Sequence, residues 1–244
     1  MSHETPKTIA GPTPEAEYQD TTLRARAQAL LREAILDGHF TAGQKLVERE
    51  LSLLTGASRS ILREALVHLE ANGLIERRSY SGFSVATLSA RNVHEIFELR
   101  ATVETAAAEL FTERASDQEI ADLRAALLVL EDCLVNFDLS RMRAAKEGFY
   151  DILFTGCRNV EISRALGNVI DRIYYLRSQL LLDPDRRQAS LAEMRRLTTA
   201  LVERDRLAAR AASLAHISAA RDALLRSMAQ DSLEEDAFSP AGRL

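Results

Sequence analysis

The chain has 244 residues, of which 46% are hydrophobic and 27% are charged, and it contains no tryptophan. This balance is typical of a folded protein built from Ala- and Leu-rich helices, and it excludes disorder for most of the chain. The net charge of −5 argues against a strongly basic nucleic-acid-binding protein, but contact with a phosphate backbone depends on where a few arginines lie. The cysteines, Cys133 and Cys157, form no CxxC motif, so we expect reduced, packed thiols.

Neither a membrane span nor a signal peptide is expected. No hydrophobic run reaches the ~18 residues that cross a bilayer, and the N-terminus lacks the basic-then-apolar order of a signal peptide. We therefore expect a cytoplasmic protein without membrane contact. The composition at the two ends predicts flexible tails over residues 1–20 and 231–244.

Three short helices are predicted after the N-terminal tail. Helical spacing runs through LRARAQALLREAILDGHF and then through VERELSLLTG, where Leu51 and Leu54 should face inward and Gly56 should end the helix. Ser58 should cap the third helix, SRSILREALVHLEANG. The period then changes, and LIERR and FSVATL predict a two-stranded ribbon with a turn at SYSG. Three helices followed by a hairpin predict a winged helix-turn-helix domain over residues 21–88.

Long amphipathic helices fill the rest of the chain. We expect them near 90–114, 117–135, 140–157, 160–182, 186–203 and 205–229. The sequence SDQE reads as a capping box, and Pro184 interrupts LLDPDRR. Short connections between such helices predict an antiparallel bundle over residues 89–230, with an interior that can hold a ligand and a role in dimerisation. The expected fold class is therefore mainly α, a winged helix-turn-helix followed by an all-helical bundle.

Two arginines on the third predicted helix are candidates for reading DNA. Arg59 and Arg63 lie one turn apart, away from the apolar stripe, and Ser60 shares their exposed side. Arginine suits this position because its planar guanidinium pairs bidentately with guanine. Arg49 and Gly82 would contact the flanking backbone or minor groove. The alternative is a solvated arginine pair, but the Gly-Ala-Ser turn before it and the ribbon after it favour DNA binding.

The segment REAILDGHFTAGQKLVERELSLLTGASRSILREALVHLEANGLIERRSYSGFSVATLS resembles the DNA-binding domain of GntR-family transcription factors. The resemblance places Arg49, Ser58, Arg59, Arg63 and Gly82 on operator-contacting positions of that family, with Arg59 and Arg63 as base readers. A second segment, IFELRATVETAAAELFTERASDQEIADLRAAL, is similar to the opening of the helical FCD domain of the FadR-type subgroup. That similarity continues to about the end of the predicted bundle.

Many members of that subgroup hold a divalent metal through an aspartate and three histidines, and the metal helps to bind a small carboxylate. In this chain Lys146, Tyr150 and Met194 stand at three of these positions, and only His216 remains. A lysine at neutral pH has no lone pair to donate, and methionine is a soft ligand. We therefore predict that the chain binds no metal and needs no cofactor.

The same substitutions suggest that a small organic acid binds directly. Lys146 and Tyr150 lie one turn apart, and the lysine takes over the electrostatic role of the metal. We expect Lys146 and Arg100 to contact the anion, Tyr150 and His216 to form hydrogen bonds with it, and Met194 to supply an apolar wall. The alternative is that Lys146 extends to solvent and the site is packed shut.

The predicted function is that of a ligand-responsive transcriptional regulator, expected to act as a repressor. It would bind a pseudo-palindromic operator in double-stranded DNA as a homodimer, with a hinge at residues 88–91. The alternative is a ligand-blind DNA-binding or architectural protein whose bundle only dimerises. An enzyme is not expected, because HEIFE lacks the second histidine of a zinc protease and no GxSxG or phosphate-binding glycine loop is present.

Overall fold

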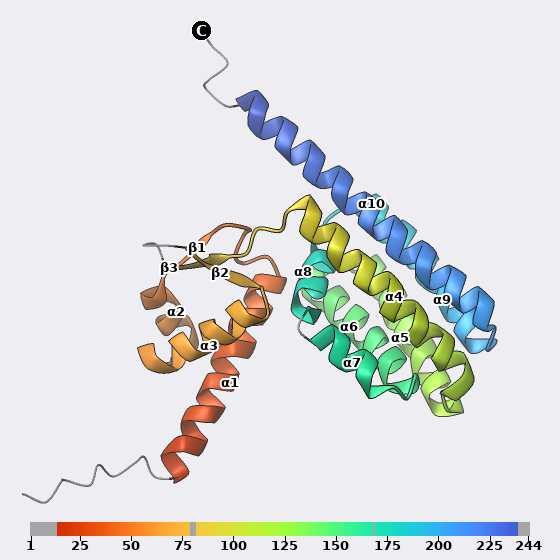
Figure 1. Cartoon of the computed structure of the whole chain (residues 1–244), viewed down its shortest axis with the longest axis horizontal. Coiled ribbons are helices and arrows are strands. Elements are labelled where there is room, and N and C mark those ends of the chain that lie inside the picture. The colour runs from red at the N-terminus through yellow and green to blue at the C-terminus, as the bar shows by residue number, and fades with distance from the viewer. Residues whose placement is uncertain (1–13, 79–81, 168, 239–244) are drawn as a thin grey trace, which may run out of the picture.

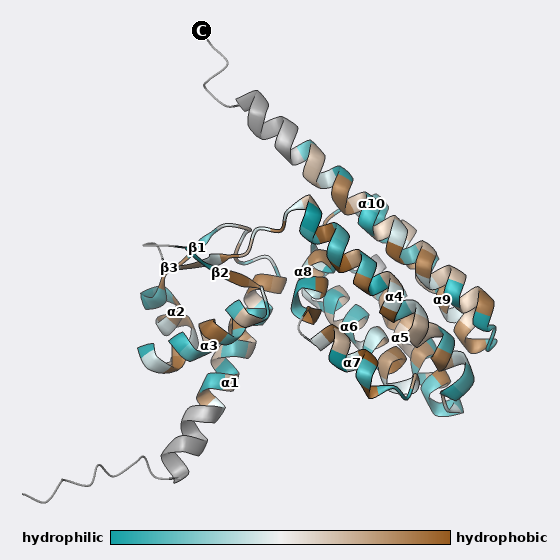
Figure 2. Ribbon diagram, in the orientation of Figure 1, coloured by the Kyte–Doolittle hydropathy of each residue, from teal (hydrophilic) through white to brown (hydrophobic). Residues whose placement is uncertain are grey.

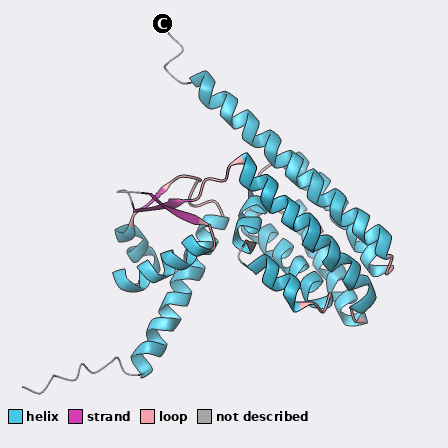
Figure 3. Cartoon of the chain, viewed as in Figure 1, coloured by secondary structure: helices cyan, strands magenta, loops and turns pink. Residues whose placement is uncertain are grey.

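The computed structural model describes residues 14–78, 82–167 and 169–238, and within them the chain forms ten helices and a small sheet. Figure 1 shows a smaller N-terminal domain with the sheet on one side and a larger helical bundle on the other. Helices (cyan in Figure 3) dominate both parts, and the strands (magenta) lie only in the smaller one. The predicted fold class is confirmed.

The N-terminal domain contains α1 (Pro14–Leu36), α2 (Glu48–Thr55) and α3 (Arg59–Ala71). The first helix begins earlier than the apolar spacing indicated, with a proline at its start, where a missing N–H costs no helical hydrogen bond. Helix α2 ends at Gly56, whose left-handed backbone (φ 68°) lets its N–H bond to the Ser52 carbonyl. The three-residue link that follows turns the chain into α3.

One expected core residue of α2 is exposed. Leu51 is buried at 2% exposure, as expected, but Leu54 is 57% exposed. The helix has only two turns, so the stripe that faces α1 and α3 accommodates Leu51, and Leu54 lies beyond its edge.

The sheet has three antiparallel strands rather than the two that the sequence predicted. β2 (Ile75–Arg78) and β3 (Gly82–Val85) form the expected ribbon, and β1 (Lys45–Leu46) pairs with the other edge of β3. A strand of two residues is too short to show an alternating pattern, so it had no period to detect. The residues of the turn between β2 and β3, 79–81, lie outside the described residues.

The C-terminal bundle contains helices α4 to α10. Their bounds are α4 Ala90–Arg114, α5 Asp117–Val135, α6 Leu139–Gly156, α7 Val160–Gly167, α8 Ile170–Leu180, α9 Pro184–Val202 and α10 Arg206–Phe238. The capping box at the start of α5 is present, with Ser116 and Glu119 exchanging hydrogen bonds. In place of the single helix expected over 160–182, the chain forms α7 and α8, with a non-helical backbone at Val169. The last helix continues past residue 229, and α4 and α10 lie side by side in Figure 1.

Each domain has its own hydrophobic core, and α8 contributes to both. Hydrophobic and hydrophilic residues alternate along the helices in Figure 2, as amphipathic packing requires. Ile173 and Leu176 of α8 belong to the bundle core, whereas Tyr174 and Tyr175 pack into the core of the N-terminal domain. The break between α7 and α8 therefore allows one short helix to lie between the two domains.

Candidate DNA-binding face and effector cavity

The exposed face of α3 carries the arginines predicted to read DNA. Arg59, Ser60 and Arg63 are all exposed, and the buried side of the helix consists of Ile61, Leu62, Ala65, Leu66 and Leu69. The Arg63 side chain is 71% exposed, and its Nε donates to Glu48 Oε1 at 3.2 Å. This ion pair holds Arg63 against α2 at a surface where such pairs contribute little, so the guanidinium is available to another acceptor.

The other residues predicted to contact DNA differ in whether they already make contacts within the protein. Arg49 is exposed on α2. The Ser58 hydroxyl caps α3 by accepting from the Ile61 N–H at 3.4 Å, so part of its hydrogen-bonding capacity serves the fold. Gly82 opens β3 with φ 82°, a backbone conformation that favours glycine, and the space around its missing side chain is open. A close approach of another backbone at that point is therefore sterically possible.

The five predicted effector residues are all buried within the bundle. Arg100 lies on α4, Lys146 and Tyr150 on α6, Met194 on α9 and His216 on α10. The structure brings Arg100, Lys146 and His216 to the wall of one cavity of about 10 Å³. Met194 lies instead on the wall of a neighbouring cavity of about 20 Å³, which Lys146 also lines. Tyr150 lines neither cavity.

Two further arginines and two carboxylates complete this cluster, and sequence reasoning missed all four. They are Glu104 on α4, Arg177 on α8, and Arg186 and Glu193 on α9. For some of them the sequence carries a trace of this burial, because the charged residue lies on the apolar stripe of its own helix. Arg177, for example, is four residues from buried Ile173 and three from buried Leu180. A charged residue inside such a stripe marks a buried ionic cluster.

The first carboxylate, Glu104, binds two of the arginines. Its Oε1 accepts from Arg100 Nε at 2.7 Å and from Arg177 Nη2 at 3.0 Å. Burial raises the pKa of Glu104, but the two guanidinium groups outweigh burial and hold this pKa below its ordinary value. The Arg177 guanidinium also lies over the Tyr150 ring, 3.5 Å from its centroid. Tyr150 is thus a support for Arg177 rather than a wall of the cavity.

The second carboxylate, Glu193, joins Arg186 to His216. Both Arg186 terminal nitrogens donate to it at 2.7 Å, and His216 Nδ1 lies 2.6 Å from its Oε2. Burial lowers the pKa of His216 to about 4, against the opposing effect of Glu193, so the imidazole is neutral at pH 7. Its Nδ1–H must then donate to the carboxylate, and His216 adds no charge to the cluster.

The cluster has more positive than negative charge. Four cationic side chains, Arg100, Lys146, Arg177 and Arg186, face the two carboxylates. Within this cluster, four buried guanidinium nitrogens have no hydrogen-bond partner among the described residues: Nη1 of Arg100, Nε and Nη1 of Arg177, and Nε of Arg186. A buried donor without an acceptor costs about 1 to 3 kcal/mol of stability, and the cost is larger for a charged group. An anion that enters the cavity would supply both the missing charge and the missing acceptors.

These residues do not fit a divalent metal. Lys146 presents an amine among three arginines, the Met194 sulfur is a soft ligand, and the neutral His216 ring is already bonded through Nδ1. Within residues 14–78, 82–167 and 169–238, no group of three or more His, Cys, Asp or Glu side chains converges as a metal site would require. The excess of cations in the cavity would also repel a metal ion.

Helix α8 connects the cavity to the DNA-binding domain. Arg177 reaches the cavity, while Asp171, two turns earlier, accepts from Arg32 Nε of α1 at 2.6 Å and from Asn72 Nδ2, just after α3, at 2.9 Å. Asp171 is only 5% exposed, so both bonds lie in the contact between the domains. Arg32 also lies over the ring of Tyr174, 5.3 Å from its centroid.

The fold and the exposed arginine-bearing face of α3 together define a DNA-binding transcriptional regulator with a winged helix-turn-helix and a helical second domain. Residues 23–85 match the model described as bacterial regulatory proteins of the gntR family, and residues 95–219 match the FCD domain. The chain belongs to the GntR family and carries an FCD domain, as its resemblance to the FadR-type subgroup implied. Its relatives are transcriptional regulators rather than enzymes.

The similarity extends over most of the chain. The Nta operon transcriptional regulator of Aminobacter aminovorans is 32% identical over 187 residues, which cover 77% of this chain and 87% of that protein. The uncharacterized HTH-type regulator YdhC of Bacillus subtilis is 29% identical over 189 residues, covering 77% and 84%. The structure of E. coli McbR/YncC has the same fold, with a TM-score of 0.72 at 18% identity over 84% of this chain and 98% of that one.

Within the described parts of the chain, none of the helices combines the length and the hydrophobicity needed to cross a bilayer.

Proposed function

We propose that this regulator binds a pseudo-palindromic operator as a homodimer, and that a small organic anion held in the bundle changes its affinity for that DNA. The first part is supported by the exposed Arg59, Ser60 and Arg63 on α3, together with Arg49 exposed on α2 and Gly82 at the start of β3. Two such faces related by a two-fold axis read two half-sites of a palindrome. A relative named for control of the Nta operon fits the same role.

The second part depends on the unpaired donors of the cavity. Arg100, Arg177 and Arg186 contribute the four guanidinium nitrogens without partners, and Lys146 contributes a further cation. If the site bound no ligand, these nitrogens would stay without acceptors, and their burial would only destabilise the folded protein. Binding of an anion converts the cost into affinity, because charge-assisted hydrogen bonds are the strong ones.

Helix α8 provides the physical connection between anion and DNA. An anion that engages Arg177 acts on the helix whose Asp171 and Tyr174 hold the DNA-binding domain. The ligand favours whichever arrangement of the domains best orients Arg177, and the change in operator affinity is limited by its differential affinity for those arrangements. Repression that is relieved by the ligand is the simplest case.

A ligand-blind regulator is the second candidate, and the small size of the cavity favours it. At about 10 Å³ the cationic cavity holds roughly one water molecule, so any ligand must displace side chains to enter. The two candidates differ in one measurable property, which is whether an anion changes operator affinity.

The DNA-binding half is tested on a sequence selected from a random DNA pool by the wild-type protein. An inverted repeat in the selected DNA supports the dimer. Arg63→Ala should weaken binding by about 1 to 3 kcal/mol per half-site and relax the choice of one base. Arg164→Ala is a matched control, because Arg164 on α7 has a similarly exposed side chain (70%) and a single surface ion pair. A uniform loss on all DNA would make Arg63 a phosphate contact, and no loss would remove it from the interface.

The ligand half is tested by thermal melts against small carboxylates, each with and without a chelator, followed by operator titrations with any compound that raises the midpoint. A shift that survives the chelator supports the metal-free site. Lys146→Met, which removes the charge at nearly constant shape, should reduce both the melt shift and the change in operator affinity. Midpoints that no anion moves would support the ligand-blind candidate.

A further inference from the structure

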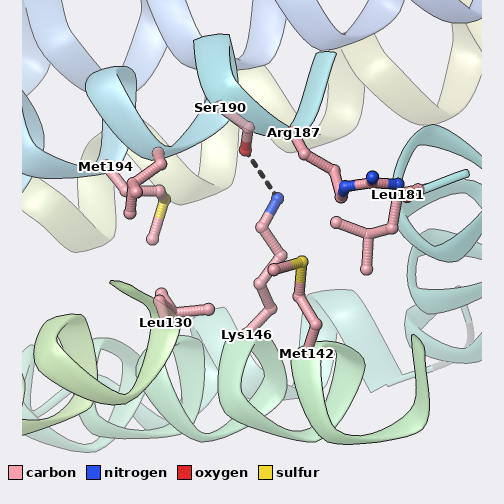
Figure 4. Close-up of a pocket in the computed structure, with 8 residues that line it drawn as sticks. Leu130, Met142, Lys146, Leu181, Arg187, Ser190 and Met194 are labelled. Atoms are coloured by element: carbon pink, nitrogen blue, oxygen red, sulfur yellow. Dashed lines mark hydrogen bonds between the residues drawn. The ribbon is translucent and has the colours of Figure 1, made fainter. Parts of the chain in front are cut away.

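Two neighbouring cavities in the bundle, here called the cationic lobe and the apolar lobe, share part of their walls. The cationic lobe, of about 10 Å³, is lined by Arg100, Arg177, Arg186 and His216. The apolar lobe, of about 20 Å³, is lined by Leu130, Met142, Leu191 and Met194, with Arg187 at its edge. Lys146, Leu181 and Ser190 belong to both walls. Figure 4 shows Lys146 extending between the methionines toward Ser190.

The lysine is poorly paired where it stands. Its Nζ donates to Ser190 Oγ at 2.7 Å, and the described residues place no carboxylate within ion-pair distance of it. Burial, followed by the nearby Arg177 and Arg186, lowers the pKa of Lys146 to about 7. An anion in the cationic lobe would supply the counterion that this amine lacks.

The apolar lobe does not favour a second charge. Leu130, Met142 and Met194 are at most 5% exposed, and burying a carboxylate among such side chains without partners is strongly unfavourable. Arg187 is the cation at this end, but its guanidinium donates to the Leu181 carbonyl at 2.7 Å and lies 3.9 Å from the centroid of the Phe137 ring. Its main interactions are thus already formed.

We propose that the effector is a short-chain monocarboxylate, with its carboxylate in the cationic lobe and its hydrocarbon tail in the apolar lobe. This inference rests on the proposed function and names the chemical class of its ligand. The carboxylate accepts from the unpaired nitrogens of Arg100 and Arg177, and Lys146 turns from Ser190 toward it. The lysine and the flexible thioethers of Met142 and Met194 move aside to join the lobes into one channel.

The test is a thermal-melt and titration series on the full-length protein with carboxylates of matched length. The monocarboxylates run from acetate to hexanoate, the dicarboxylates from succinate to adipate, and butyramide is the uncharged control. Each added methylene should tighten monocarboxylate binding about four-fold until the apolar lobe is full. A dicarboxylate should bind more weakly than the monocarboxylate with the same number of carbons, and butyramide should not bind.

Variants distinguish the apolar lobe from the rest of the bundle. Met194→Gln should flatten the dependence of affinity on tail length while acetate still binds, whereas Leu128→Gln, at an exposed position of α5, should leave the series as in the wild type. If Met194→Gln does not fold, Met142→Ala provides the second test, because a larger lobe moves the optimum to a longer tail.

The outcomes separate this inference from the proposed function. Dicarboxylates that bind as well as or better than monocarboxylates of equal length, or an affinity independent of the tail, would overturn the two-lobed ligand and leave the anion site standing. If no carboxylate in the series shifts the melt, both the anion site and this inference fail.

Discussion

The Glu104 carboxylate provides a sharp test of the buried cluster. It is 1% exposed, and it accepts from Arg100 Nε at 2.7 Å and from Arg177 Nη2 at 3.0 Å. Glu104→Ala leaves both guanidinium groups without a counterion in the protein interior. Breaking a buried ion pair in this way costs about 3 to 5 kcal/mol. For a protein of this size that corresponds to a drop in Tm of about 6 to 20 °C, since 1 kcal/mol shifts Tm by roughly 2 to 4 °C.

A matched control lies on the same helix. Glu109 also binds two arginines, Arg206 at 2.9 Å and Arg210, but their side chains are 58% and 59% exposed. Surface pairs contribute at most about 1 kcal/mol each, so Glu109→Ala should lower Tm far less. Both variants are melted with and without formate, and formate should restore more of the Tm of Glu104→Ala than of Glu109→Ala. Equal losses for the two variants would refute the idea that the cluster is short of negative charge.

Three further changes test other parts of the structure. Burial raises the pKa of Glu193, but its histidine and arginine partners outweigh burial and lower this pKa to about 2 from the ordinary 4.5. The ionised carboxylate therefore stabilises the folded state, and this contribution is lost as the pH falls from 4.5 to about 2. Glu193→Gln should therefore flatten the pH dependence of the unfolding free energy in urea between those values, and an unchanged slope would contradict the assignment. Gly156→Ala should destabilise the protein by about 1 to 3 kcal/mol, because its new Cβ would lie 2.5 Å from the Phe111 ring. Gly148→Ala on the same helix meets open space and should stabilise the protein by about 0.5 to 1 kcal/mol. Equal Tm values for the two variants would argue against the contact with Phe111. Asp171→Ala should speed proteolysis of the link between β3 and α4, because its bonds to α1 and α3 hold the domains together, and an unchanged rate would assign it no such role.

The helices were predictable where local rules decide. Ser58 and Ser116 mark helix starts because their side chains bond to nearby backbone N–H groups, and Gly56 marks an end because it adopts the left-handed conformation. The strand β1 and the break before α8 were missed, since each depends on packing against distant parts of the chain. Leu54 was misplaced for the same reason, because which edge of a short helix is covered is a tertiary property.

The candidate effector site was predictable only in part. Lys146, Met194 and His216 were found through positions that many members of the FadR-type subgroup use for a metal, and they do lie on the walls of the two lobes. That route could not reveal Arg177 or Arg186, which occupy no metal-ligand position. Their role depends on the joint geometry of α8 and α9, which helical spacing alone does not fix.

The shared helix α8 limits how this regulator can be recombined with others. Tyr174 and Tyr175 complete the core of the N-terminal domain, although in the sequence they follow four helices of the bundle, α4 to α7. A chimera that joins these DNA-binding residues to a foreign effector domain would lack that part of the core and would need a compatible tyrosine-bearing face in its new partner. Exchange of specificity between such regulators, in evolution or by design, must therefore carry the surface of α8 together with the recognition helix.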